Sequence, residues 1–377
     1  MSEHIISALK KNGVEFVAGV PDSLLNPVIQ SFDSAGFKHV RAPNEGSAIA
    51  MAAGWSLTRS SIPLVYMQNS GLGNAVSPLM SLAHERVYGL PMILLIGWRG
   101  RPGYKDEPQH LPQGECTIDM LTSMGIPYRV LEDASVMSEV DAAFEFAASK
   151  TGPSAILIGP KTLSSKAASG LGSSDRSLKA SPSRADYLEV LLAQIEEQDL
   201  YVSTTGYTSR EAFVQFENHK ALDQLMMNVG AMGHAISIAL GLSISQPGMQ
   251  VFCLDGDGSV AMHMGGLSGV ANQAPSNLVH VVFNNKTHES VGAEPTVLSE
   301  TRLSPIASAL GYQSSRFIDS ADSLKEILVE IRSTPGPHFI ELYTALGVPS
   351  DLPRPSRSPK ELLGELRSRI SGLTASE

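Results

Sequence analysis

The chain has 377 residues, of which 42% are hydrophobic and 18% charged, and its formal net charge is −10. This balance excludes a disordered chain and a membrane protein, and the acidic charge disfavours nucleic-acid binding. Two cysteines, Cys116 and Cys253, offer neither a disulfide framework nor a metal-ligand cluster, which favours a reducing compartment. The N-terminus lacks a signal-peptide pattern, and the longest apolar stretch, residues 87–98, is too short to span a bilayer. We therefore expect a soluble, cytoplasmic protein of about two domains.

Apolar runs alternate with helical segments in the first half of the chain. The predicted strands are residues 14–20, 63–68, 91–97 and 155–158. The predicted helices are residues 48–59 and 77–84, and a glycine-rich turn is expected at residues 69–74. Continuous apolar strands between helices are typical of a parallel sheet covered on both faces. The first half is therefore predicted to be one doubly wound α/β domain.

A serine-rich segment, residues 164–184, separates this half from a second one with the same alternation. It has few large apolar side chains and no period, so it is predicted to be a linker; an ordered loop within one domain is the alternative. The later strands are predicted at residues 200–204, 250–254, 278–283 and 337–342, and the helices at 235–245 and 361–370. We expect two doubly wound parallel-sheet domains, residues 1–163 and 185–377, the second with a helical tail.

The strongest chemical signal is the sequence Gly-Asp-Gly-Ser at residues 256–259, followed after residues 260–283 by Asn284-Asn285. Both motifs come directly after predicted strands, and ligands of open α/β sheets bind at the carboxyl ends of the strands. Glycines allow close approach of a phosphate, and a carboxylate with an amide oxygen suits Mg²⁺ that is shared with phosphate groups. The pair predicts a site for a metal-bridged diphosphate, and two unrelated turns are the alternative.

These motifs at this spacing resemble the signature of the thiamine diphosphate decarboxylases and synthases. The resemblance implies that Glu45 hydrogen-bonds the aminopyrimidine ring of the cofactor; the alternative is a helix-start glutamate behind an Asn44 N-cap. It also implies that Met232 supports the bent cofactor, that the Gly230 carbonyl accepts from its amino group, and that residues 205–208 line its pyrimidine and diphosphate. The implied cofactor contacts are Glu45, Gly71, Asn74, Thr205, Gly206, Tyr207, Gly230, Met232, Gly256, Asp257, Gly258, Ser259 and Asn285. The implied Mg²⁺ ligands are Asp257, Asn285 and the carbonyl of Thr287.

Within these enzymes the chain is most similar to the short family of phosphonopyruvate and sulfopyruvate decarboxylases, because it has no room for a middle domain. The segments that carry this similarity are residues 20–25, 105–110, 205–211, 263–265 and 288–292. The chain departs from the family pattern at Gly292-Ala293-Glu294, where a Gly-Gly-Gln-like run is expected and this chain has an acid instead. The resemblance implies decarboxylation of 3-phosphonopyruvate to phosphonoacetaldehyde in phosphonate biosynthesis, with 3-sulfopyruvate as the alternative substrate.

Candidate substrate and proton-transfer residues lie on three loops. Arg99, Arg101, Lys105 and His110 are predicted to bind the anionic substrate; a solvated surface loop is the alternative. Proton transfer is assigned to Asp22, Ser23, His110 and His288, although Asp22 and Ser23 also suit a helix-capping pair. His84 is predicted to be structural, and the role of Arg210 is left open.

The resemblance further implies a homodimer or higher homo-oligomer whose active sites lie between chains, with no nucleic-acid or membrane partner. A carboligase normally needs a longer chain, and a non-catalytic thiamine-binding subunit would lack Glu45 or the metal ligands. A nicotinamide-binding dehydrogenase would need Gly-x-Gly-x-x-Gly after the first strand, where this chain has Val-Pro-Asp-Ser at residues 20–23.

Overall fold

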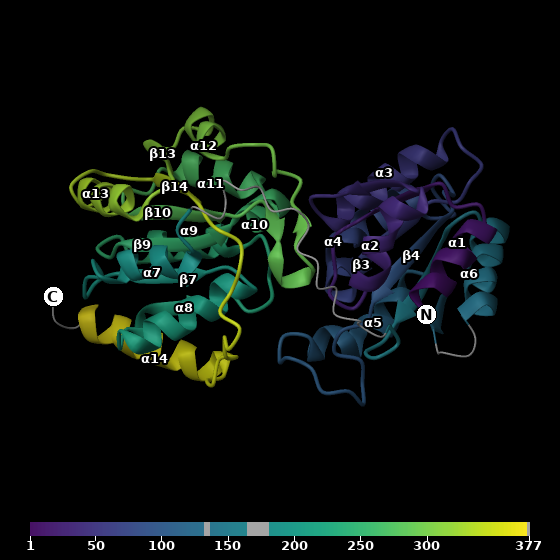
Figure 1. Cartoon of the computed structure of the whole chain (residues 1–377), viewed down its shortest axis with the longest axis horizontal. Helices are drawn as coiled ribbons and strands as arrows, with labels where there is room; N and C mark the ends of the chain where they lie inside the picture. Colours follow the sequence, from purple (N-terminus) through teal and green to yellow (C-terminus); the bar gives the residue numbers. More distant parts are fainter. Residues whose placement is uncertain (132–135, 164–180, 375–377) are drawn as a thin grey trace. The chain divides into compact units, whose positions relative to one another are not determined.

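The computed structural model describes residues 1–131, 136–163 and 181–374, and it consists of two compact units, Met1–Gly170 and Leu171–Glu377 (Figure 1). The boundary between the units falls within the segment expected to be a linker, of which residues 164–180 lie outside the described residues. The described chain after this segment enters helix α7 (Arg184–Leu192), whose N-cap Ser183 forms a capping box with Asp186.

The first unit is built on a six-stranded parallel sheet with the strand order β2-β1-β3-β4-β6-β5. The central strands are apolar throughout because helices cover both faces. The strands are β1 (Phe16–Gly19), β2 (Lys38–Arg41), β3 (Leu64–Gln68), β4 (Met92–Gly97), β5 (Tyr128–Leu131) and β6 (Pro153–Ile158).

Two hydrophobic clusters lie on opposite faces of this sheet, since alternate residues of each strand point to opposite sides. Tyr66 of β3 packs in one cluster and its neighbour Met67 in the other. The first cluster is covered by α1 (Ser2–Lys11), α2 (Asn26–Ala35) and α6 (Val136–Lys150). The second is covered by α3 (Glu45–Ser56), α4 (Leu72–Pro78) and α5 (Leu111–Ser123).

The second unit has another six-stranded parallel sheet, with the order β13-β14-β10-β9-β7-β8. If the six strands are numbered 1 to 6 in chain order, the sheet reads 2-1-3-4-6-5 from its β8 edge, which is the order of the first sheet. The two units therefore repeat one topology. The strands are β7 (Leu200–Ser203), β8 (Leu225–Met227), β9 (Val251–Gly256), β10 (Leu278–Asn284), β13 (Ser314–Ile318) and β14 (His338–Tyr343).

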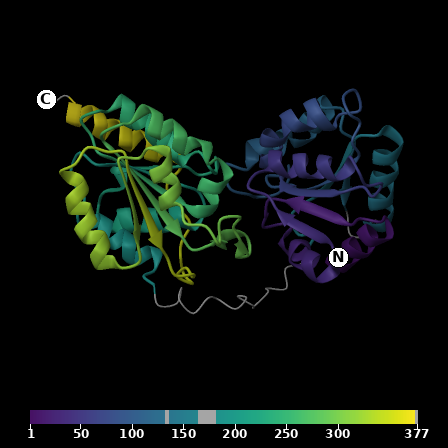
Figure 2. The ribbon, with the colours of Figure 1, turned by 90° about the horizontal axis from the view of Figure 1, so that it is seen from above.

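Helices also cover both faces of the second sheet (Figure 2). One face carries α7, α8 (Tyr207–Asn218) and α13 (Ala321–Arg332). The other carries α9 (Ala235–Ser245), α10 (Asp257–Met262), α11 (Gly265–Gln273) and α12 (Ser304–Leu310). The tail helix α14 (Pro359–Thr374) contributes Leu362 to the hydrophobic cluster under α7, α8 and α13, and Leu366 to the cluster on the opposite face. A small antiparallel ladder joins β11 (Thr287–His288) to β12 (Glu294–Pro295).

This topology fixes where a ligand binds in each unit. The chain leaves β7 toward the edge strand β8 and leaves β9 in the other direction toward β10, so the loops after β7 and β9 diverge. A crevice forms at such a switch point, outside the carboxyl ends of the strands. The corresponding switch point of the first unit lies between β1 and β3. The prediction of two doubly wound parallel-sheet domains is confirmed, and no helix among the described residues is long and apolar enough to span a membrane.

The segment expected to be a glycine-rich turn, residues 69–74, differs from the prediction. Residues Asn69–Gly71 form one 3₁₀ turn, and α4 already begins at Leu72. The helix then continues into a π-helical turn over Leu79–Ala83. The segment that resembled a glycine-rich turn is therefore helical. The glycine at position 71 has a packing reason instead, since a Cβ there would overlap the side chain of Glu45.

Candidate active site

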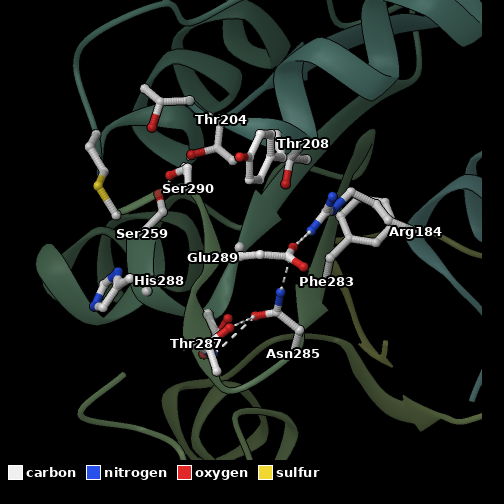
Figure 3. Close-up of a pocket in the computed structure, with 17 residues that line it drawn as sticks. Arg184, Thr204, Thr208, Ser259, Phe283, Asn285, Thr287, His288, Glu289 and Ser290 are labelled. Carbon is white, nitrogen blue, oxygen red and sulfur yellow. Dashed lines mark hydrogen bonds and ion pairs between the residues drawn. The ribbon is translucent and has the colours of Figure 1, made fainter. Parts of the chain in front are cut away.

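A cavity lies at the switch point of the second unit (Figure 3). Most of its lining comes from three segments at the carboxyl ends of strands: residues 204–208 after β7, residues 256–259 at the junction of β9 and α10, and residues 285–290 after β10. Of the residues predicted to bind the cofactor from this half, only Gly230 is not part of the lining. The predicted residues that line the cavity are Thr205, Gly206, Tyr207, Met232, Gly256, Asp257, Gly258, Ser259, Asn285, Thr287 and His288.

The glycines of these loops have different structural reasons. Gly206 has φ 77° and ψ −143°, a backbone conformation that L side chains rarely adopt, and it precedes α8. A Cβ on Gly258 would lie 2.6 Å from the ring of His288, so the imidazole needs that glycine. A Cβ on Gly256 would meet nothing within 4 Å. No neighbouring atom therefore requires glycine at position 256. The space beside this residue in the cavity wall is open to a bound group.

The loop that carries Met232 is fixed by hydrogen bonds at both ends. The Asn228 side chain donates to the Ala231 carbonyl at 2.6 Å and accepts from the Ala231 amide at 3.0 Å. The Gly233 amide donates to the Ser259 hydroxyl, which also accepts from the Thr204 hydroxyl. The Gly230 carbonyl accepts the Met232 amide at 2.9 Å. This network holds Met232, half-buried, in the cavity wall.

The chemistry of the cavity suits a divalent cation. Asp257 is 2% exposed, accepts a hydrogen bond from Thr296 at 2.7 Å, and burial raises its pKa to about 7. Among the described residues no cationic side chain shifts this pKa. Asn285 and Thr287 line the same cavity, and a buried carboxylate beside amide and carbonyl oxygens is the donor set that Mg²⁺ takes. These residues therefore fit the metal expected with a diphosphate.

A buried ion network beside these oxygens was not predicted from the sequence. Arg184 donates to Glu211 at 2.5 Å and to Glu289 at 2.9 Å, and Glu289 also accepts from the Asn285 amide group at 3.2 Å. Arg184 is 4% exposed and lines the cavity. Arg184 lies far in sequence from both glutamates and, unlike Glu211 and Glu289, belongs to no segment that carried the family resemblance. Arg210, whose role was left open, donates to the carbonyls of Leu352 and Pro353 and so holds the tail.

In the first unit, Glu45 lies with the two other residues predicted to contact the cofactor. Glu45 is the first residue of α3, and Asn44 caps this helix by accepting from the Ser47 amide at 2.8 Å. The Glu45 side chain is nevertheless buried, at 5% exposed. The Asn74 side chain donates to Glu45 Oε2 at 2.8 Å, and Gly71 packs against the same carboxylate. The structure therefore places Gly71 and Asn74 around the catalytic glutamate predicted from the sequence.

Asp22 and Ser23 follow β1 at the switch point of the first unit. Asp22 Oδ1 accepts from the amides of Leu24 and Leu25, while Oδ2 is buried without a hydrogen-bond partner. Burial raises the pKa of Asp22 to about 6, although the nearby Arg99 guanidinium lowers it. Ser23 is exposed and accepts a hydrogen bond from Arg99. Both the capping contacts and an unpaired carboxyl oxygen are present, so the two interpretations of Asp22 are compatible.

The loop predicted to supply cations for the substrate contains fewer free charges than its sequence indicates. Asp106 forms a bidentate ion pair with Arg99, at 2.5 and 2.8 Å. Burial, together with Arg99, lowers the pKa of His110 to about 4, so this imidazole is neutral at pH 7. Arg101 lies over the rings of Trp98 and Tyr104, and Lys105 is exposed. Arg99 and His110 are thus close together, and the Arg99 charge is shared with Asp106.

Two family models match the chain. The model described as "Thiamine pyrophosphate enzyme, N-terminal TPP binding domain" matches residues 1–122. The model described as "Thiamine pyrophosphate enzyme, C-terminal TPP binding domain" matches residues 205–342. The first match contains Glu45 and Asn74, and the second contains the loops that line the cavity.

Curated relatives are similar over almost the whole chain. A phosphonopyruvate decarboxylase of Streptomyces hygroscopicus is 35% identical over 96% of this chain and 92% of the relative. One of Streptomyces viridochromogenes is 34% identical over 97% and 94%. A sulfopyruvate decarboxylase of Methanosarcina acetivorans is 24% identical over 95% of both chains.

Proposed function

This chain belongs to the thiamine pyrophosphate enzymes, as a decarboxylase, and from that premise we propose that it converts 3-phosphonopyruvate into phosphonoacetaldehyde and CO₂. The observation that carries the substrate assignment is the 35% identity, over 96% of the chain, with a phosphonopyruvate decarboxylase. The product class places the reaction in the biosynthesis of phosphonates. Sulfopyruvate is the second candidate, because a sulfopyruvate decarboxylase also matches over nearly full length, at 24% identity.

The residues of the second unit hold the diphosphate end of the cofactor. Asp257, Asn285 and the carbonyl of Thr287 bind Mg²⁺, which offsets the cost of burying a carboxylate beside a diphosphate. Gly206 and Gly256 would leave the backbone accessible to the cofactor, and Met232 in the cavity wall would pack against it. Bound thiamine diphosphate supplies the electron sink for the electron pair that the departing CO₂ leaves behind.

Glu45 is the residue that positions and activates the pyrimidine end. Asn74 donates to Oε2 of Glu45, so Oε1 remains to hydrogen-bond the ring nitrogen of the cofactor. Burial in a low-dielectric site strengthens that hydrogen bond, and the packing of Gly71 restricts the carboxylate to one position. The glutamate thus controls the protonation of the pyrimidine through geometry that the first unit already provides.

Substrate binding and proton transfer fall to the loops after β1 and β4. Arg99 presents a guanidinium, Ser23 a hydroxyl, and neutral His110 an imidazole that can donate a hydrogen bond to an anionic group. Asp22, with a pKa of about 6, exchanges a proton readily near neutral pH and delivers it to the carbon that CO₂ leaves. His288 borders Gly258 in the second unit and is the other proton-transfer candidate.

Each active site combines the Glu45 unit of one chain with the Asp257 unit of a second copy, in a homodimer or larger homo-oligomer. The resemblance to thiamine diphosphate enzymes supports this assembly. Sulfopyruvate decarboxylase relatives are also described as separate alpha and beta subunits. In Methanothermobacter thermautotrophicus, the alpha subunit matches a segment that makes up 34% of this chain, and the beta subunit matches a segment that makes up 47%. An active site assembled from two kinds of domain is therefore compatible with either one chain or two.

The test is CO₂ release from 3-phosphonopyruvate by the full chain with thiamine diphosphate and Mg²⁺. Glu45→Gln keeps the shape of the side chain and removes its charge, so we expect kcat to fall by roughly 10²-fold or more. Glu85→Gln, an exposed site in the same unit, is the matched control and should leave kcat unchanged. Undiminished turnover by Glu45→Gln would contradict the assigned role, and no turnover by the wild type would contradict the proposed function.

A further inference from the structure

Arg184 is a buried arginine that the assigned catalytic and binding roles do not use. It is the first residue of α7, and its guanidinium bridges Glu211 of α8 and Glu289 of the loop after β10. All three side chains are at most 11% exposed. A buried arginine with two carboxylates leaves a net negative charge inside the protein, which is costly unless the geometry serves a purpose.

The network ends on a residue assigned to the metal. Glu289 Oε2 accepts both from Arg184 and from the amide group of Asn285, as Figure 3 shows. With its NH₂ group fixed on Glu289, the Asn285 amide turns its oxygen toward Thr287, from whose backbone amide it accepts at 3.1 Å. A metal ligand must present this oxygen rather than the nitrogen.

A second connection holds the same glutamate from another side. Glu289 Oε1 accepts from the Gly347 amide, and nearby the Ala345 amide donates to the Pro182 carbonyl, two residues before Arg184. Both oxygens of Glu289 are therefore fixed, one by the segment that enters the second unit and one by the segment after β14. The Arg184 Nε is buried without a hydrogen-bond partner, so the guanidinium is held by its two carboxylates.

We propose that Arg184 is a positioning residue for the cofactor's metal: it fixes Glu289, which orients the Asn285 amide oxygen for Mg²⁺. This inference rests on the proposed function, because it assumes that the cavity takes Mg²⁺ with a diphosphate. Groups that orient a metal ligand typically contribute roughly 10–100-fold to metal affinity. A purely electrostatic role has the opposite sign, since removal of a positive charge beside the site strengthens cation binding.

The test is a calorimetric titration of Mg²⁺ into the full chain saturated with thiamine diphosphate and without substrate. For Arg184→Gln we expect the Mg²⁺ dissociation constant to rise by roughly 10–100-fold, with much of kcat recovered at saturating Mg²⁺. Arg184→Lys keeps the charge but lacks the planar fork whose two nitrogens reach Glu211 and Glu289 separately, so it should also weaken binding, and it carries the test if the glutamine variant does not fold.

Arg332→Gln is the matched control. Arg332 pairs with buried Asp199 at the amino end of β7, whereas the cavity lies at the carboxyl end of this strand. This variant should therefore lose stability without a change in Mg²⁺ affinity. Unchanged or tighter Mg²⁺ binding by both Arg184 variants would overturn the positioning role. Absence of Mg²⁺ and cofactor binding by the wild type would instead overturn the proposed function itself.

Discussion

Buried carboxyl groups carry most of the chemistry proposed at the residue scale, and their surroundings differ. Glu45 has an amide donor from Asn74, whereas Asp22 has one oxygen without a partner. Burial raises the pKa of Asp22 to about 6, so this carboxyl changes its protonation near neutral pH. Gly97 makes this burial feasible, since a Cβ at that position would overlap the Asp22 carboxyl.

The raised pKa of Asp22 predicts a pH-dependent stability difference for Asp22→Asn. The carboxyl group has a pKa of 3.8 in the unfolded chain and about 6 in the folded protein. Its ionisation therefore does not lower the free energy of unfolding below pH 4, and lowers it by the full amount above pH 6. The asparagine variant should then be more stable than wild type at pH 8, by an amount on the order of 2–3 kcal/mol. Thermal unfolding at pH 4 to 8 measures it, and a constant difference over this range would contradict the shift.

The residues that sequence reasoning found at the site were those in local motifs, such as residues 256–259. Arg184, Glu211 and Asn228 were missed because their partners are distant in sequence or are backbone groups, and nothing local distinguishes a buried ion pair from a surface charge. Asp106 is the converse case. It lies seven residues from Arg99 in a loop whose cations were predicted to face the substrate, and it is the carboxylate that pairs with one of them.

At the scale of elements, the central strands were predictable because burial on both faces of the sheet leaves a continuous apolar run. The helix over residues 235–245 was predicted from its apolar composition, although Ile244 is exposed. The edge strands were not. Lys38–Arg41 and Tyr128–Leu131 are short and partly exposed, so their sequences resemble loops, and only their pairing with β1 and β6 makes them strands. Edge placement depends on the topology, which no single segment encodes.

The contact between the 3₁₀ turn and the start of α3 gives a prediction with a built-in control. Gly71→Ala places a Cβ on the Glu45 carboxylate and displaces it, so we expect kcat to fall by roughly 10-fold or more. Gly73→Ala lies two residues further along in α4, where a Cβ meets nothing within 4 Å. That variant should keep full activity and gain up to about 1 kcal/mol of helix stability. Equal activity of the two variants would exclude this packing role.

On the scale of the whole molecule, the repeated topology brings residues of the proposed active site to the carboxyl ends of the strands in both sheets. Glu45, Asp22 and Arg99 follow strands of the first sheet, and Asp257 and Asn285 follow strands of the second. Glu45 and the proposed metal ligands lie in different units, so the proposed site needs residues of both. The proposal that each site takes one unit from each of two copies can be tested.

Complementation between two inactive variants tests whether each active site is built from two chains. Glu45→Gln and Asp257→Asn each inactivate a chain, but a mixed dimer has one site with both native residues and one with neither. If half of the dimers are mixed after random subunit exchange, about one quarter of wild-type activity should return. Each variant incubated alone is the control. Sites confined within single chains would give no recovery after proven exchange.

The most direct measurement of the central claim is a side-by-side comparison of initial rates with 3-phosphonopyruvate, 3-sulfopyruvate and pyruvate. The full chain is assayed with thiamine diphosphate and Mg²⁺ by CO₂ release, with phosphonoacetaldehyde identified as the product of the first reaction. We predict the highest kcat/KM for 3-phosphonopyruvate. A higher kcat/KM for 3-sulfopyruvate would contradict the substrate assignment while retaining the mechanism, and no CO₂ from any of the three would contradict the decarboxylase function.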